Sequence, residues 1–310
     1  MDFKHISVLL SETIDSLDIK SSGTYVDCTA GGSGHASQVL SLLDENGRLI
    51  LIDQDPDAIE ILTERLGHDK RVTIIKDNFS NLKNILEDLS VDEVDGVLAD
   101  LGVSSHQLDT ASRGFSLHND SPLDMRMSRE GISAADVVNT YGERELARII
   151  SEYGEEKFAR SIARNIVRER SEGAIDSTLR LAEIIKYSIP AAARRTGGHP
   201  ARKTFQAIRI EVNRELERLE TTLDTMFDSL KEDGRLSIIT FHSLEDRIVK
   251  KKFALFCEGC TCPKEFPICV CGKTPRGKLP FKFKTASEEE LSMNPRSRSA
   301  TLRTIQKLHN

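Results

Sequence analysis

The chain reads Thr24-Tyr25-Val26-Asp27-Cys28-Thr29-Ala30-Gly31-Gly32-Ser33-Gly34-His35 close to its start. The apolar residues are typical of a buried strand, and the glycines that follow are typical of a tight turn. Such a turn lets backbone N–H groups approach a ligand closely. We therefore expect a strand, a ligand-binding turn and a helix that begins near His35.

Alternating strands and helices extend from this segment to residue 100. We expect strands over 24–27, 48–53, 72–75 and 96–100, with helices over 35–43, 56–66 and 82–89. This alternation predicts βαβ units and a parallel sheet, which is an α/β fold. Ligands of such sheets bind at the carboxyl ends of the strands, where this chain carries Asp27, Asp53 and Asp100.

The next part of the chain has a helical pattern. Apolar residues recur at three- and four-residue spacing over 134–190, and again over 205–230, where they predict one long amphipathic helix. The polar stretch 104–131 has no periodicity, and a loop of this length is usually functional or disordered.

A further strand, over 234–241, returns the chain to the sheet, and Ser243 with Asp246 is the expected cap of the helix after it. We expect one discontinuous sheet domain, over 1–109 and 199–310, and an inserted all-helical domain over 110–198.

Composition and charge indicate a globular protein. The 310 residues are 38% hydrophobic and 30% charged, no segment is apolar over a membrane's thickness, and the start lacks a signal-peptide pattern. We expect a cytoplasmic protein without a membrane partner. Residues 242–310 carry a formal charge of +7 and the rest −13, so the basic end can bind phosphates locally. The sequence predicts no oligomeric state.

The glycine turn and the acid after the second strand predict a nucleotide-type cofactor. Gly31 begins the turn, and Asp53, 22 residues later, can accept hydrogen bonds from ribose hydroxyls. NAD fits this spacing too, but Ser37 stands where an NAD-binding turn has its third glycine. The acid-led turn resembles that of class I methyltransferases, which favours S-adenosylmethionine. Phe79 either lies against the adenine or belongs to the core.

A cluster of cysteines lies near the C-terminus. Clustered cysteines indicate either a structural zinc site or a loop of reduced thiols. The candidate ligands are Cys257, Cys260, Cys262, Cys269 and Cys271.

Several segments resemble the signature of one family in order, from His5 to Arg303. They include Asp100-Leu101-Gly102-Val103-Ser104-Ser105, Pro122-Leu123-Asp124-Met125-Arg126-Met127 and Phe241-His242-Ser243-Leu244-Glu245-Asp246. The chain thereby resembles the RsmH (MraW) family of small-subunit ribosomal RNA cytosine-N4 methyltransferases.

The resemblance implies an S-adenosylmethionine-dependent class I fold with an inserted helical substrate-recognition domain. It implies methylation of a cytidine N4 in the decoding centre (P site) of 16S rRNA, in the small ribosomal subunit or a late assembly intermediate. The chain departs from the family pattern at Ser33, where a glycine is usual, and at Ser7, where a proline is usual. The implied cofactor contacts are Ser33, Gly34, His35, Asp53, Phe79, Asp100 and Gln107.

Two residues are candidates for handling the proton of the target amine. Asp100 is the first, as a hydrogen-bond acceptor at the rim of the sheet. His242 is the second, because histidine transfers protons near neutral pH, although it can equally be a helix-start residue. Two other functions remain open: a dinucleotide oxidoreductase, and a zinc-assisted RNA-binding or ribosome-assembly factor.

Overall fold

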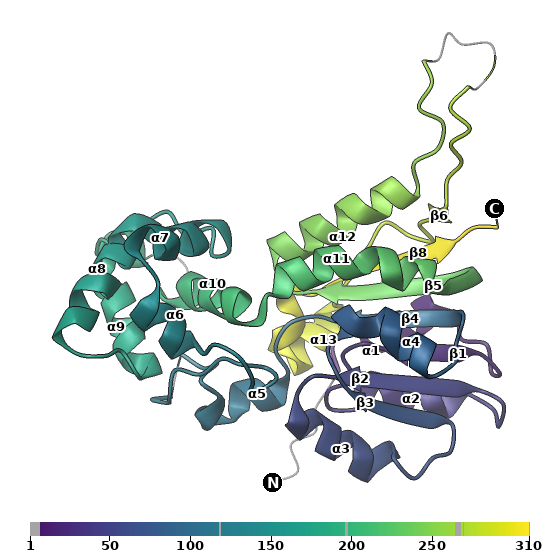
Figure 1. Ribbon diagram of the computed structural model, residues 1–310, viewed down its shortest axis with the longest axis horizontal. Coiled ribbons are helices and arrows are strands. Elements are labelled where there is room, and N and C mark those ends of the chain that lie inside the picture. The colour runs from purple at the N-terminus through teal and green to yellow at the C-terminus, as the bar shows by residue number, and fades with distance from the viewer. Residues whose placement is uncertain (1–6, 118, 196–197, 264–267, 269, 310) are drawn as a thin grey trace. The chain divides into compact units, whose positions relative to one another are not determined.

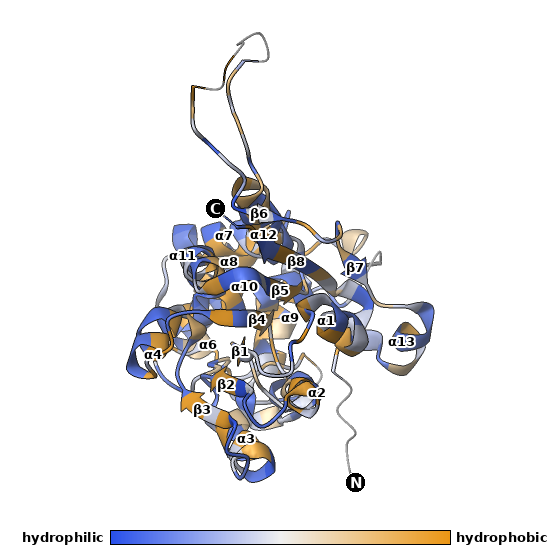
Figure 2. Ribbon diagram, turned by 90° about the vertical axis from the view of Figure 1, so that its right-hand side faces the viewer, coloured by the Kyte–Doolittle hydropathy of each residue, from blue (hydrophilic) through white to orange (hydrophobic). Residues whose placement is uncertain are grey.

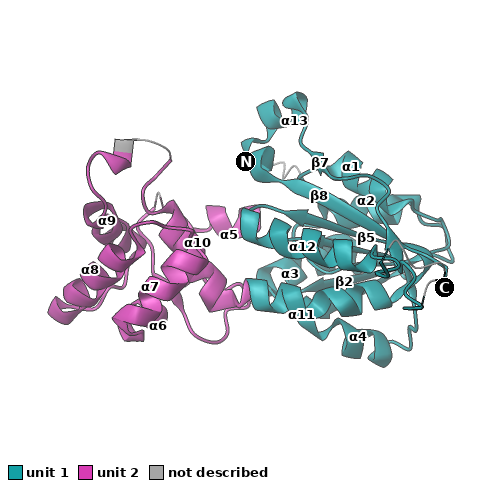
Figure 3. Ribbon diagram, turned by 90° about the horizontal axis from the view of Figure 1, so that it is seen from above, with its two compact units in different colours: residues 1–102, 216–310 teal, residues 103–215 magenta. Residues whose placement is uncertain are grey.

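The computed structural model describes residues 7–117, 119–195, 198–263, 268 and 270–309. The chain forms two compact units (Figure 3): a sheet unit, residues 1–102 with 216–310, and a helical unit, residues 103–215. The unit boundaries thus differ from the expected 109/110 and 198/199. The reason is that Val103 and Leu108, before the first expected boundary, and Phe205, after the second, pack against the core of the inserted helices.

The sheet unit contains a doubly wound sheet with the order β3-β2-β1-β4-β5-β8-β6, and β7 pairs with β8 (Figure 1). Strands β1 to β5 are parallel, and β8 is antiparallel to its partners β5, β6 and β7. The expected parallel α/β sheet is confirmed. The strands are β1 Thr24–Asp27, β2 Arg48–Asp53, β3 Val72–Lys76, β4 Val94–Asp100, β5 Leu230–Thr240, β6 Gly277–Lys278, β7 Lys284–Thr285 and β8 Thr301–Lys307.

Helices cover both faces of this sheet because consecutive strand residues, which point to opposite faces, are apolar. Leu49 and Leu51 of β2 pack with α1, α2 and α3, whereas Ile50 and Ile52 pack with α4, α11 and α12. In the described ranges, no helix has the length and apolar character to cross a membrane. The helices of this unit are α1 Leu10–Leu17, α2 Gly34–Leu42, α3 Pro56–Leu66, η1 Phe79–Asn81, α4 Leu82–Asp88, α11 Glu215–Asp228, α12 Ser243–Phe256, α13 Glu288–Met293 and η4 Pro295–Ser299.

The helical unit has its own apolar core, and its helices end where the chain leaves the helical conformation. The expected single helix over 205–230 is wrong: α10 ends at Asn213, Arg214 has a φ of +51°, and α11 begins at Glu215. A residue in the left-handed region breaks a helix even where the apolar spacing continues. The elements are α5 Ser105–Asp109, η2 Ala111–Arg113, α6 Ala134–Thr140, α7 Glu143–Glu152, α8 Ala159–Glu172, α9 Thr178–Ser188, η3 Ala193–Arg195 and α10 Arg202–Asn213.

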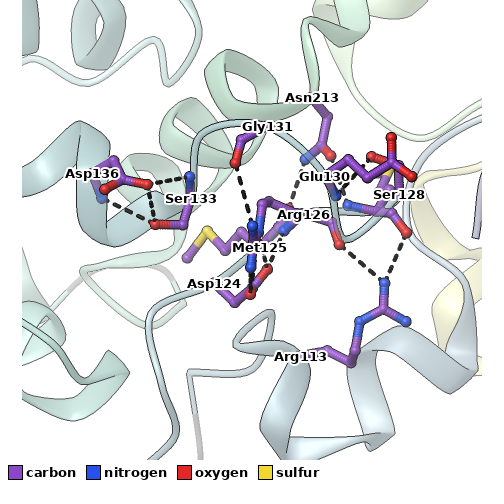
Figure 4. Close-up of polar contacts among 11 residues, drawn as sticks. Arg113, Asp124, Met125, Arg126, Ser128, Glu130, Gly131, Ser133, Asp136 and Asn213 are labelled. Atoms are coloured by element: carbon purple, nitrogen blue, oxygen red, sulfur yellow. Dashed lines mark hydrogen bonds and ion pairs between the residues drawn. The ribbon is translucent and has the colours of Figure 1, made fainter.

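After α5 and η2, the aperiodic stretch that follows β4 is held by buried hydrogen bonds (Figure 4). The Arg113 guanidinium donates to the carbonyl oxygens of Arg126 and Met127, at 3.0 and 2.9 Å. Asn213, at the end of α10, accepts from Met127 N and donates to Met125 O, both at 2.8 Å. The loop is therefore an ordered part of the helical unit over its described residues.

Asn213→Ala should destabilise the helical unit by about 2–4 kcal/mol, because it leaves a buried N–H and a buried carbonyl without their partner. Urea unfolding followed by circular dichroism measures the loss. Asn84→Ala is the matched control, since Asn84 is exposed on α4, and its effect should stay within about 0.5 kcal/mol. Equal effects of the two substitutions would contradict this account of the loop.

Candidate functional site

The turn after β1 is hydrogen-bonded to the ends of both neighbouring strands. On one side, Gly31 N donates to Asp53 Oδ2, at the end of β2, over 2.8 Å. On the other side, Asp100 N, at the end of β4, donates to Thr29 Oγ1 over 2.6 Å. Gly31 has a φ of +46°, which glycine adopts without strain. The turn thus brings the carboxylates of β1, β2 and β4 to one rim.

Burial raises the pKa values of these three carboxyl groups. It raises the pKa of Asp27 to about 7, to which the negative charge of Asp53 adds. Burial likewise raises the pKa of Asp53 to about 6. The pKa of Asp100 lies well above its ordinary value because of burial and because of the charges of Asp27 and Glu245. A cationic ligand at this rim would favour the ionised carboxylates.

The two carboxylate oxygens of Asp100 differ in their surroundings. Its Oδ2 lies 3.7 Å from His35 Nδ1, and His35 Nε2 lies 3.0 Å from the carbonyl oxygen of Val8. Its Oδ1 is buried and has no hydrogen-bond partner among the described residues. Since His35 Nε2 faces a carbonyl oxygen, the neutral ring carries its proton on that atom, and Asp100 Oδ1 is an acceptor available to a ligand.

His242 follows β5, the strand beside β4, and is the N-cap of α12. Its Nδ1 accepts from Glu245 N over 3.4 Å, while Glu245 Oε2 accepts from Phe241 N over 2.8 Å. The expected cap at Ser243 is wrong, because Ser243 is already the first helical residue. Since Nδ1 accepts, we infer that neutral His242 carries its proton on Nε2. That atom is buried, 3.1 Å from Glu245 Oε1, without the alignment of a hydrogen bond.

The observed interactions of Ser33 and Gly34 are within the protein and determine the shape of the turn. Ser33 has a φ of +71°, and its N–H, which we expected to face the cofactor, donates to Ala30 O over 2.9 Å. Its hydroxyl accepts from Arg65 over 3.3 Å. A side chain at Gly34 would place Cβ 1.8 Å from Ser7 Oγ, so the Ser7 hydroxyl would have to move away.

The remaining expected cofactor contacts lie in different units. Phe79 begins η1 and is partly buried against the core of the sheet unit. Gln107 belongs to the helical unit, where its Oε1 accepts from Ser104 N over 3.0 Å as part of a capping box. All the expected contacts except Gln107 therefore lie in the sheet unit.

The structure brings three of the five cysteines together. The Sγ atoms of Cys260, Cys262 and Cys271 lie within 4.8 Å of one another. Cys257 is separate, because it follows α12 and packs against the sheet-unit core, where burial raises the pKa of its thiol. Cys269 lies outside the described residues.

Comparison with known proteins identifies the family. The sequence profile of the MraW methylase family matches residues 2–308. The chain belongs to the MraW methylase family. The α/β fold with an inserted helical unit, expected from the sequence, is confirmed.

Relatives of this MraW family member share most of its length. It is 57% identical to the "Ribosomal RNA small subunit methyltransferase H" of Clostridium botulinum, over 99% of this chain and 100% of the relative. It is 55% identical to the protein of the same name from Lachnospira eligens, over 99% of each chain. A solved rRNA methylase from Streptococcus thermophilus is 10% identical, with a TM-score of 0.41 over 98% of each chain.

Two residues that organise this MraW site were not singled out from the sequence. Thr29 stands in the glycine turn, where its place in the acid-led pattern could have indicated it. Glu245 stands three residues after His242, which is the spacing of a capping box. The spacing is counted from His242, so it is not apparent when Ser243 is taken as the cap.

Ser33→Gly should raise the free energy of unfolding by about 0.5–1 kcal/mol, because glycine removes the strain of a left-handed residue. Two effects reduce this gain in stability: the hydrogen bond from Arg65 is lost, and glycine increases the conformational entropy of the unfolded chain. Ser37→Gly, at an exposed position within α2, is the matched control and should lower the free energy of unfolding by about 0.5 kcal/mol. Chemical denaturation measures both, and shifts of the same sign would contradict the strain argument.

Asp27→Asn should flatten the pH dependence of stability. The native protein keeps the Asp27 proton up to about pH 7, whereas the unfolded chain loses it near 3.8. The native state binds more protons across this window, so the free energy of unfolding falls as pH rises, by at most about 4 kcal/mol for this group.

The melting temperature of the cofactor-free protein, measured between pH 5 and 8, tests this. The amide oxygen introduced by Asp27→Asn can still accept from Thr29 N, so the turn should remain. Asp88→Asn, at an exposed position, should keep the wild-type slope. An unchanged slope in Asp27→Asn would show that Asp27 is not the titrating group.

Proposed function

We propose that this protein transfers a methyl group from S-adenosylmethionine to the exocyclic N4 of a cytidine in the decoding centre (P site) of small-subunit 16S rRNA. Membership of the MraW methylase family supports the methyl transfer. The name of its relatives supports small-subunit rRNA as the substrate. The observation that favours an amino group as the target is the unpartnered Asp100 Oδ1 at the rim of the sheet.

The residues of the rim fit S-adenosylmethionine. The two oxygens of Asp53 accept from Gly31 N and Asp55 N, both at 2.8 Å, and each keeps a lone pair for a ribose hydroxyl. Phe79, partly exposed after β3, offers a ring to an adenine. The cofactor supplies an electrophilic methyl group and a positive charge. That charge suits a rim whose buried carboxylates have raised pKa values.

Asp100 and His242 suit the two kinds of polar group on the edge of a cytosine. The N4 amine has two N–H donors and a lone pair delocalised into the ring, so its orientation decides its reactivity. Asp100 Oδ1 would accept from N4–H and draw the lone pair out of conjugation. His242 Nε2–H would donate to ring N3 or O2. The cap that uses His242 Nδ1 favours Asp100, rather than His242, as the proton acceptor.

The helical unit presents an exposed aromatic side chain between two cations. Tyr187, at the end of α9, is 71% exposed. Lys186 Nζ and the Arg194 guanidinium lie 5.8 and 5.9 Å from the centre of its ring. An exposed ring stacks on an unpaired base, and neighbouring cations bind phosphates. We therefore assign RNA recognition to the helical unit, with Tyr187 as a stacking residue.

Methyl transfer to small ribosomal subunits tests the function. The subunits, or late assembly intermediates, come from cells that lack this protein, and labelled S-adenosylmethionine is the donor. Mass spectrometry of the nucleosides and of RNase fragments should find one N4-methylated cytidine in the P site. Methylation at a different atom or nucleotide would overturn the assignment, and binding of NAD without methyl transfer would indicate an oxidoreductase.

The same assay tests the role of Asp100. Asp100→Asn should lower kcat by at least about 100-fold, because the amide is a weaker acceptor for the amine protons. Asp92→Asn, at an exposed position just before β4, is the matched control and should retain activity. A rise in KM for the cofactor with an unchanged kcat would make Asp100 a binding residue only.

A further inference from the structure

The segment between α12 and β6, residues 257–276, forms a cysteine loop that has no core of its own. Its described arms extend away from the rest of the sheet unit (Figures 1 and 2). None of its described residues is buried, and Ile268 and Val270 are 74% and 73% exposed. Apolar packing therefore does not hold the described arms together.

The base of the cysteine loop is fixed by backbone and ring contacts. Arg276 N donates to Phe256 O over 2.8 Å, which joins the two arms where they leave the sheet unit. The Arg276 guanidinium also lies over the stacked rings of Phe227 and Phe256, 5.2 and 5.5 Å from their centres. Beyond this base, the arms approach each other at the ion pair of Lys273 Nζ with Glu258 Oε2, 2.7 Å apart, and again at the cysteines.

The thiols at that approach have the spacing of metal ligands. Cys260 Sγ and Cys271 Sγ are 3.7 Å apart, which is too long for a disulfide bond of about 2.05 Å. Two sulfurs bound to one tetrahedral zinc at about 2.3 Å lie roughly 3.8 Å apart. Cys262 Sγ completes the group within 4.8 Å and accepts from Val270 N over 3.4 Å. A backbone N–H donated to sulfur is an interaction that orients metal-bound thiolates.

We propose that Cys260, Cys262 and Cys271 bind a structural zinc ion that joins the two arms of the cysteine loop. Thiolates select zinc over magnesium or calcium, and the 3.7 Å between Cys260 Sγ and Cys271 Sγ suits a tetrahedral site. Three thiolates leave one position for a further ligand. Cys257 is excluded from the trio by its packing against the sheet-unit core. The proposal is independent of the methyl-transfer function, because the ion lies on a loop and takes no part in the reaction.

Metal analysis of the full-length protein tests the site. Protein purified under reducing conditions without chelators should contain about one zinc ion per chain. Cobalt substitution should produce thiolate-to-cobalt charge-transfer absorption. Cys260→Ser, Cys262→Ser and Cys271→Ser should each raise the zinc Kd by at least about 100-fold. No zinc and no cobalt absorption in the wild type would overturn the proposal.

Cys257→Ala is the matched control, because it removes a thiol from the same loop without touching the trio, and it should keep the zinc. Loss of zinc in Cys257→Ala, with retention in the three serine variants, would overturn the assignment. A measurement on the wild type avoids any folding defect of the variants: chelation should accelerate tryptic cleavage after the exposed Lys273. Cleavage at an unchanged rate would contradict a structural role for the ion.

Discussion

Parallel pairing of β1 with β2 on one side and with β4 on the other is the constraint on which the site depends. The pairing places Asp27 beside residues of both neighbours, so Asp53 and Asp100 end their strands at the same rim. The turn after β1 then uses one backbone N–H and one hydroxyl to hold those two ends. A shift in either register would separate the carboxylates and leave the turn without its partners.

Three carboxyl groups lie close together at the buried rim. Their ionisation is unfavourable in the cofactor-free protein. Burial and mutual repulsion raise the pKa values of Asp27, Asp53 and Asp100 above their ordinary range. Groups with such shifts occur where a protein must meet a charged ligand. A cationic cofactor would offset the free-energy cost of ionising these buried carboxylates, and this gain would contribute to its binding. Glu245 contributes by holding His242 in the capping box of α12.

The two units differ in how much of them the sequence predicts. Over the first hundred residues, the expected strands and helices lie within two residues of their bounds, because period-two and helical patterns are local, whereas α1 was not expected. The break at Arg214 was missed, because its cause is a backbone conformation and the bonds of Asn213 to a distant loop. The order of the aperiodic loop was missed for the same reason. The cap at His242 was missed because a histidine side chain replaces the usual hydroxyl.

The sequence by itself determined the α/β class, the family, the acid-led glycine turn and the identity of the acids at the rim, since these depend on residue types and local spacing. Only the tertiary structure decided how those residues act. It showed that the Ser33 N–H is used within the turn, that Asp100 has an unpartnered oxygen, and which cysteines meet. These features depend on distances between segments far apart in the chain, which spacing along the sequence does not encode.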